Sequence, residues 1–177
     1  MVRCGLISTR RMLPIPRREW IEAIQHDFET RLKWCTTSTY DKANHRPKIT
    51  TPDGTDITVR SGVKVTLRAT VVENDKEDRE AMWNLNYALY QQYGMTKERF
   101  MSGEGPKGTG WNAGWYQVPL AGSYKGFISL PGMGRGEVNF TAPKVDKEET
   151  IHVILEVTDN GIPSLTSYKR FIVTVKP

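Results

Sequence analysis

The sequence has few of the residues that build metal sites or disulfide scaffolds. It contains only two cysteines, Cys4 and Cys35, and three histidines among 177 residues. No combination of them has the spacing of a zinc site, and the spacing of the two cysteines leaves open whether they pair. Long apolar runs are also lacking, so no segment is expected to cross a bilayer. These shortages favour a globular domain without a metal or other cofactor.

Catalytic and phosphate-binding motifs are missing as well. His26, His45 and His152 are scattered, and none accompanies a serine or cysteine in a nucleophile-elbow motif. The glycine-rich run 132–136 lacks a Walker lysine and leads into a strand-like pattern, whereas a phosphate loop leads into a helix. The chain by itself is therefore not expected to be an enzyme.

Charge of a single sign is scarce except at the N-terminus. The net charge of +5 comes from 25 basic and 20 acidic residues that are interspersed, which predicts a solvated surface and no nucleic-acid or membrane partner. Residues 1–18 contain arginines but no acid. Such a tail fits a transit peptide, a linker or the cut edge of a longer protein, although Pro14 and Pro16 disfavour a long amphipathic helix.

The C-terminal run 136–177 alternates between apolar and polar residues. A period of two with β-branched and aromatic residues predicts three antiparallel strands that bury one face. Residues 159–163 predict the turn between the last two strands. The residues expected to face the core are Val138, Phe140, Ala142, Ile151, Val153, Leu155, Val157, Phe171, Val173 and Val175.

Shorter strand patterns precede this run, and the total of about seven to nine strands is typical of an Ig-like or fibronectin-like antiparallel β-sandwich. Residues 56–60 and 63–72 are expected to pair around Ser61-Gly62. The glycine-rich stretch 91–114 predicts a long loop or insertion. Further strands are expected at residues 48–51, 115–118 and 126–130.

One strong helical pattern lies before the sandwich, at residues 17–35. Trp20, Ile24, Phe28 and Leu32 recur every four residues and form an apolar stripe. The stripe needs a partner, which is either the sandwich or another domain. The expected organisation is therefore an N-terminal tail, helix and linker at 1–45, followed by a sandwich domain at 46–177.

Two parts of the sequence resemble one known family. The first is the helical run 18–35 with Ala43-Asn44-His45-Arg46-Pro47 after it. The second extends from Trp115 through Phe140-Thr-Ala-Pro143 and the run 149–161 to the last strand. Together they resemble the C-terminal part of cellulose-binding proteins that carry a nucleoside-hydrolase-like domain. Arg46 stands where that family usually has proline, and residues 73–114 diverge.

The resemblance implies an extracellular accessory sandwich that attaches to a polysaccharide such as cellulose or supports the hydrolase-like domain. Residues 1–45 would be the remnant of that domain, which would pack on the apolar stripe. The domain's D-x-D-x-x-x-D-D calcium motif is absent from this sequence, which implies a truncated or split member. Two alternatives stay open: part of a glycosidic-bond hydrolase whose catalytic domain is missing, or a cadherin-like interaction module.

Four aromatic residues in or beside the glycine-rich region are candidates for carbohydrate binding, because flat rings stack on sugar faces. They are Trp111, Trp115, Tyr116 and Tyr124. A structural role is the alternative for each, since sandwiches bury at least one tryptophan.

Two minor patterns complete the candidates. Asp146 and Glu148 with Asp159 partly match a cadherin calcium site, but a shared sandwich architecture explains this likeness without calcium. Asn139-Phe140-Thr141 is a glycosylation sequon on the outer face of its strand, and it matters only in a secreted eukaryotic protein.

Overall fold

A computed structural model of the chain describes residues 20–72, 75, 83–84, 92, 94, 96–101, 111–131 and 135–177. The predicted mainly β fold with an N-terminal helix is confirmed. No helix in these ranges is long and apolar enough to span a membrane. The elements are α1 (Ile21–Thr36), η1 (Tyr40–Lys42), β1 (Lys48–Thr50), β2 (Asp56–Arg60), β3 (Lys64–Arg68), β4 (Thr70–Val72), α4 (Lys97–Met101), β5 (Trp111–Gln117), β6 (Glu137–Thr141), β7 (Glu149–Asp159) and β8 (Thr166–Lys176).

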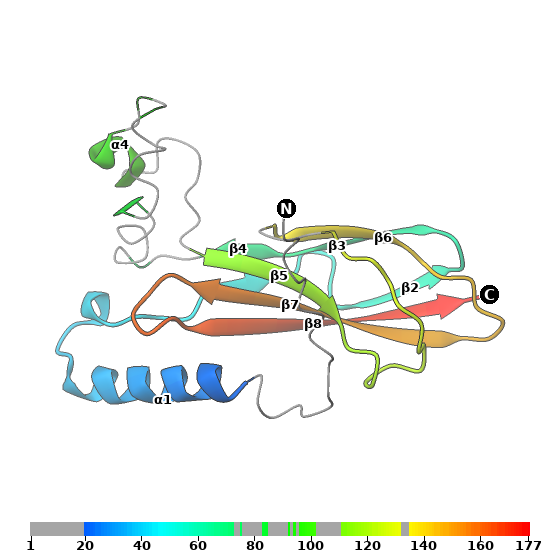
Figure 1. Cartoon of the computed structure of the whole chain (residues 1–177), viewed down its shortest axis with the longest axis horizontal. Helices are drawn as coiled ribbons and strands as arrows, with labels where there is room; N and C mark the ends of the chain where they lie inside the picture. Colours follow the sequence, from blue (N-terminus) through cyan, green and yellow to red (C-terminus); the bar gives the residue numbers. More distant parts are fainter. Residues whose placement is uncertain are drawn as a thin grey trace, which may run out of the picture.

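The strands form two layers that face each other across one core (Figure 1). One layer is a four-stranded sheet in the order β2-β8-β7-β5, and the other contains the pairs β3-β6 and β1-β4. The pairs are antiparallel except β2 with β8, which run parallel. The expected antiparallel sandwich is therefore confirmed, with one parallel pair at the edge of the larger sheet.

The predicted pairing of residues 56–60 with 63–72 is wrong. β2 pairs with β8, whereas β3 pairs with β6 in the opposite layer. The chain changes layers at Ser61-Gly62: the Ser61 N–H donates to the Lys176 carbonyl at 2.8 Å, and the Gly62 N–H donates to that of Ala142 at 2.9 Å. Gly62 has a φ of 78°, a left-handed conformation that glycine adopts without strain.

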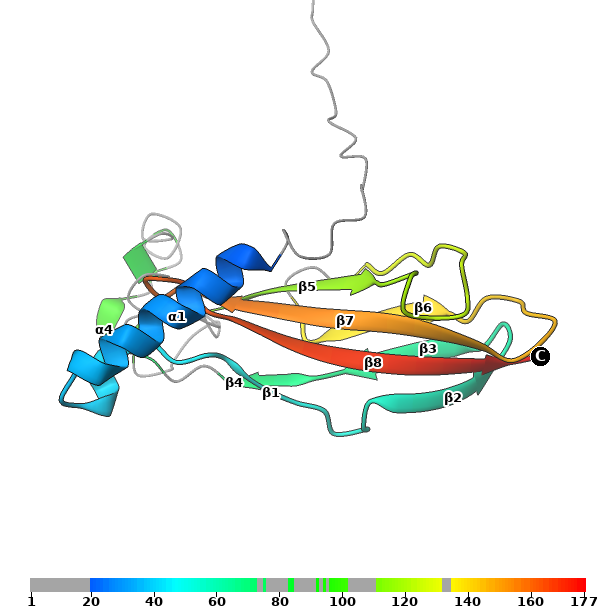
Figure 2. The same cartoon turned by 90° about the horizontal axis from the view of Figure 1, so that it is seen from below.

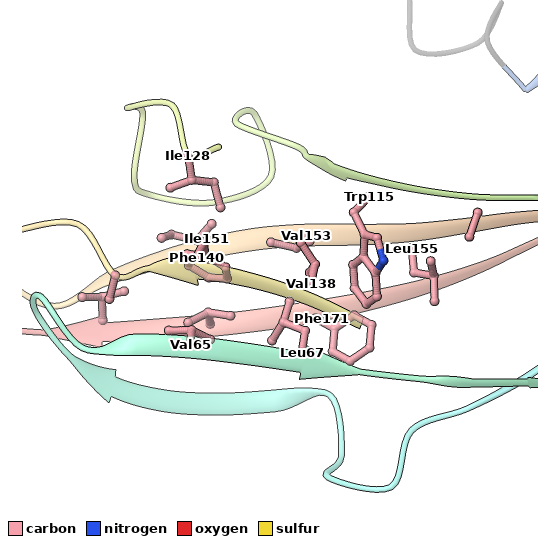
Figure 3. Packing of buried hydrophobic residues seen from close by; sticks show 14 of the residues in the cluster. Val65, Leu67, Trp115, Ile128, Val138, Phe140, Ile151, Val153, Leu155 and Phe171 are labelled. Carbon is pink, nitrogen blue, oxygen red and sulfur yellow. The ribbon is translucent and has the colours of Figure 1, made fainter. Parts of the chain in front are cut away.

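β7 and β8 are the central strands of the larger sheet, and their alternation gives the buried face that the sequence predicts. Phe171 and Leu155 are fully buried from this side, and Leu67 and Val138 meet them from β3 and β6 (Figure 3). The first strand of the C-terminal run, β6, pairs with β3 and thus lies across the core from β7 and not beside it. Full burial of one such side chain stabilises the fold by about 1.5–3 kcal/mol.

Two further boundaries differ from the prediction. β5 begins at Trp111, so the loop expected over 91–114 includes its first four residues, and α4 also falls inside that range. No strand forms at residues 126–130. The Gln117 side chain holds this segment instead, accepting the Ile128 N–H at 3.0 Å and donating to the Gly126 carbonyl at 2.9 Å.

α1 lies against the outer face of the four-stranded sheet, near β7 and β8 (Figures 1 and 2). The predicted helix is confirmed over Ile21–Thr36. Residues 17–19 of the prediction lie outside the described part of the chain. The division of the chain into a unit at 1–45 and a sandwich at 46–177 stays a prediction.

Candidate functional site

β5 separates the aromatic residues that the sequence singles out. Trp111 and Trp115 are an even number of residues apart and face the core, whereas Tyr116 faces the opposite side of the sheet. Tyr124 follows β5 in a loop and packs against the core from outside the sheet. The four rings therefore do not form one continuous surface.

Trp115 is a structural anchor. Its side chain is 8% exposed, and its ring lies 5.3 Å from that of Phe171 at an angle of 42°. The indole N–H donates to the Arg135 carbonyl at 2.8 Å, which satisfies the one polar atom that burial would otherwise leave unpaired. No ring face of Trp115 is left for a sugar.

Tyr116 belongs to a polar cluster on the outer face of the sheet. Its hydroxyl donates to the Glu156 carboxylate at 3.3 Å. Burial and the negative charge of Glu156 raise the pKa of Tyr116 well above its ordinary value, although a hydrogen bond with Trp20 acts in the other direction. Burial and the Glu156 charge also raise the pKa of Tyr168. Tyr116 is thus a partly covered hydrogen-bonding group.

The calcium candidates lie at opposite ends of β7. Asp146 and Glu148 precede the strand and are exposed, whereas Asp159 ends it and is buried. An extended strand of this length spans on the order of 30 Å, so the three carboxylates cannot share one ion. In the described ranges no cluster of three or more histidine, cysteine or acidic residues could hold a metal ion.

Asp159 instead fastens the linker after α1 to the turn between β7 and β8. One carboxylate oxygen accepts the N–H groups of Leu165 at 2.8 Å and Gly161 at 3.0 Å, and the Asn44 amide at 3.4 Å. Asn44 also donates to the Pro163 carbonyl at 2.8 Å. A side chain at Gly161 would collide with the Asn44 amide, so this contact requires glycine.

Most of the apolar stripe of α1 faces away from the sandwich, although Trp20 at its start contacts Tyr116. Ile24, Phe28 and Leu32 are each more than half exposed, with Phe28 at 65%, whereas Thr30 on the opposite face is 1% exposed. Polar contacts hold the inner face: His26 Nδ1 lies 2.9 Å from the Ser164 carbonyl oxygen. Of the two partners considered for the stripe, the sandwich therefore does not cover Ile24, Phe28 and Leu32.

A pocket that the sequence analysis missed lies beyond the C-terminal end of α1. We call it the Tyr40 pocket; its volume is about 390 Å³, and it is lined by Trp34, Thr37, Ser38, Thr39, Tyr40, Ala43 and His45. The Tyr40 and His45 rings stack with centroids 3.6 Å apart, and those of Trp34 and His45 are 5.6 Å apart. The closely spaced Trp34, Tyr40 and His45 were its only signal in the sequence.

The remaining candidates are placed as follows. Asn139 faces outward from β6; its amide oxygen accepts the Thr66 hydroxyl at 2.6 Å, and its amide nitrogen donates to Glu137 at 3.2 Å. Its glycosylation stays a prediction. Cys35 is exposed and free, and Cys4 lies outside the described residues.

Comparison with known protein families gives a match within the β-sandwich. Residues 102–175 match the model of the family described as cellulose-binding protein Sde0182, C-terminal domain. The family resemblance is confirmed. The matched segment starts just before β5 and includes β6, β7 and most of β8, the strands that carry most of the core. No curated protein matches the chain.

Solved structures show the same fold in a larger protein. The chain is similar to a nucleoside hydrolase-related hypothetical protein from Saccharophagus degradans that is associated with carbohydrate metabolism, with a TM-score of 0.64 and 24% identity. The match covers 89% of this chain and 32% of that protein, so this chain spans about a third of its length. The cadherin domains 3–6 of protocadherin gamma B2 match with a TM-score of 0.40, 13% identity and coverages of 75% and 25%, which is too low to support a conclusion.

Proposed function

We propose that this chain is a non-catalytic carbohydrate-binding module of a carbohydrate-active, nucleoside-hydrolase-like protein, and that cellulose is its polysaccharide. The observation that carries the proposal is the match of residues 102–175 to the C-terminal domain of a cellulose-binding protein. The absence of the D-x-D-x-x-x-D-D motif from the sequence supports a non-catalytic role. An extracellular location follows from the same proposal.

The decisive measurement is retention of the whole chain on insoluble cellulose. The wild-type protein is expected to leave the supernatant as cellulose is added. A Trp111→Ala/Tyr116→Ala double variant that is folded by circular dichroism is expected to remain in solution if β5 carries the site. Trp115 is left unchanged because its side chain is buried in the core, whereas Trp111 at the start of β5 is only partly buried.

An Asp146→Ala variant is the control, because Asp146 is exposed and lies at the far end of β7 from the start of β5. It should bind as the wild type does. If the wild-type chain stays in the supernatant with cellulose and with related insoluble glucans, the proposed function is wrong.

We also propose that the exposed stripe of α1 packs against a nucleoside-hydrolase-like domain. An isolated helix gains nothing from an apolar face in water, so Ile24, Phe28 and Leu32 are best explained by a partner that covers them. The similarity to the Saccharophagus degradans protein supports this, because the match covers 89% of this chain within a protein about three times as long.

This docking can be measured in trans. The part of the Saccharophagus degradans protein that this chain does not match is expected to bind the wild-type chain in a titration followed by light scattering. An Ile24→Ser/Phe28→Ser/Leu32→Ser variant should lose that binding, because it removes apolar area that binding buries. Substitution of Glu22, Gln25 and Glu29 by serine at exposed polar positions of the same helix is the matched control. Equal binding by both variants would exclude the stripe as the docking surface.

A further inference from the structure

The Tyr40 pocket has the dimensions of a small-molecule site. Its volume of about 390 Å³ lies within the range of roughly 300–1,000 Å³ that is typical of ligand pockets. Its position is distinct from the β5 aromatic residues, because it is built by the end of α1, by η1 and by the linker before β1.

The aromatic rings of the pocket are held in place before any ligand arrives. The His45 main-chain N–H donates to Asp75 at 2.6 Å, and its ring Nδ1 lies 3.3 Å from both carboxylate oxygens of Asp75. The Trp34 indole N–H donates to the Asn44 carbonyl at 3.0 Å, which fixes the second ring. Asn44 is itself held by Asp159, so the pocket is anchored to the sandwich. Such preorganisation lowers the entropy that binding costs.

Tyr40 supplies the open platform. Its ring is stacked on His45 with an angle of 16° between the planes, yet its side chain remains 72% exposed. A tyrosine ring with one face supported and most of its surface in water resembles the platforms on which flat apolar faces stack.

The rest of the lining indicates what kind of molecule fits. It contributes the hydroxyl groups of Ser38 and Thr39, each of which can both donate and accept hydrogen bonds. The Thr37 hydroxyl already donates to the Lys33 carbonyl at 2.8 Å and is left as an acceptor. None of the described residues that line the pocket is a lysine, arginine, aspartate or glutamate, which disfavours a phosphate or carboxylate ligand. Aromatic faces combined with neutral hydroxyl groups match an uncharged sugar.

We infer that the Tyr40 pocket is a carbohydrate subsite that takes a short segment of a neutral glucan chain, with one sugar ring stacked on Tyr40. This inference rests on the proposed function and assigns a second contact surface to it, separate from β5. A site on the linker would bring the polysaccharide close to the end of α1.

The test uses the whole chain and cellohexaose as the probe. Titration calorimetry gives the affinity, and the nitrogen-15 NMR signal of the Trp34 indole reports whether the sugar enters this pocket. Tyr40→Ala is expected to weaken binding by about tenfold or more, since it removes the stacking platform. Tyr40→Phe keeps the ring and is expected to stay within about threefold of the wild type.

Phe127→Ala is the matched control, because it also removes an exposed aromatic ring, one that is 84% exposed in the loop after β5. It should leave the affinity and the Trp34 shift unchanged. A Trp34 shift that survives Tyr40→Ala, or cellohexaose binding without any change at Trp34, overturns the inference, whereas binding at β5 alone would not move the Trp34 signal. So does the absence of binding by the wild type to cellohexaose at millimolar concentration.

Failure of this inference and failure of the proposed function give different results. If the wild type is retained on insoluble cellulose and Tyr40→Ala is retained equally, the pocket is excluded and the function stands. If cellohexaose shifts Trp34 but insoluble cellulose does not retain the chain, the pocket binds sugar and attachment to cellulose is wrong.

Discussion

Replacing Phe171 by alanine is expected to lower the free energy of unfolding by about 3–5 kcal/mol, the usual cost of removing a large ring from a closed core. Phe171 is fully buried on a central strand and supports the ring of Trp115 at 5.3 Å. The cavity would therefore loosen a second large side chain. Urea unfolding followed by tryptophan fluorescence measures the change.

The same chemical change at Phe127 is the control. Because Phe127 is exposed, its replacement by alanine should change the stability by no more than about 0.5 kcal/mol. If Phe171→Ala cost as little as Phe127→Ala, the two layers would not pack on Phe171 as the structure shows.

Asp159→Ala is expected to have the second large effect, a loss of about 2–4 kcal/mol. The substitution removes the acceptor of three hydrogen bonds at a side chain that is only 2% exposed, so the N–H groups of Gly161 and Leu165 lose their partner inside the protein. It also removes the 3.4 Å hydrogen bond from Asn44 and so weakens the hold on the linker after α1, although the Asn44 amide still donates to the Pro163 carbonyl. Asp146→Ala, on an exposed carboxylate, should be close to neutral in the same urea titration.

Asp159 also has a characteristic pH dependence. Burial raises the pKa of this carboxyl above its ordinary value of 3.8, and the charge of Asp75 adds to the increase. The hydrogen bonds of the carboxylate with Leu165, Gly161 and Asn44 lower the pKa but do not cancel the effect of burial. The folded state then holds the proton more tightly than the unfolded state, so this group's contribution to stability is largest below pH 3.8 and declines as the pH rises through the higher folded pKa. Asp159→Asn cannot titrate, so the stability advantage of the wild type over this variant should shrink as the pH rises. An advantage that instead grew with pH would contradict the raised pKa.

The alternation of apolar residues was sufficient to predict which side chains fill the core. Ile151, Val153, Leu155 and Val157 are buried as expected, because a strand turns successive side chains to opposite faces whatever it pairs with. The family resemblance independently implied the same fold, and the match of residues 102–175 to the family model supports that resemblance.

Strand pairing could not be predicted in the same way. Alternation identifies the buried face of a strand but says nothing about its neighbour, so β2 and β3 looked like a hairpin although Gly62 sends the chain into the other layer. The parallel contact of β2 with β8 joins residues more than a hundred positions apart, and no local signal encodes it.

The candidate site shows the same limit. Composition identified candidate aromatic residues on and beside β5, but only the register of β5 shows that Trp115 faces the core and Tyr116 does not. Tyr40 and His45 were missed because their stacking depends on Asp75, which lies 30 residues after His45. The partial calcium pattern has the same limit, because Asp146 and Glu148 precede an eleven-residue strand that Asp159 ends.

Because α1 turns its apolar stripe away from the sandwich, polar and charged side chains attach the helix to the sheet. Its inner face meets the sandwich through charged and polar groups, among them Lys33 on the Ile162 carbonyl, and Arg46 joins Asp27 at 2.7 Å. Mobile ions screen such contacts, whereas they leave the core of β7 and β8 unaffected. We therefore expect added salt to weaken the attachment of the helix while the sheet stays folded, so that the helix amides exchange with solvent faster, through a local opening, than the core amides do.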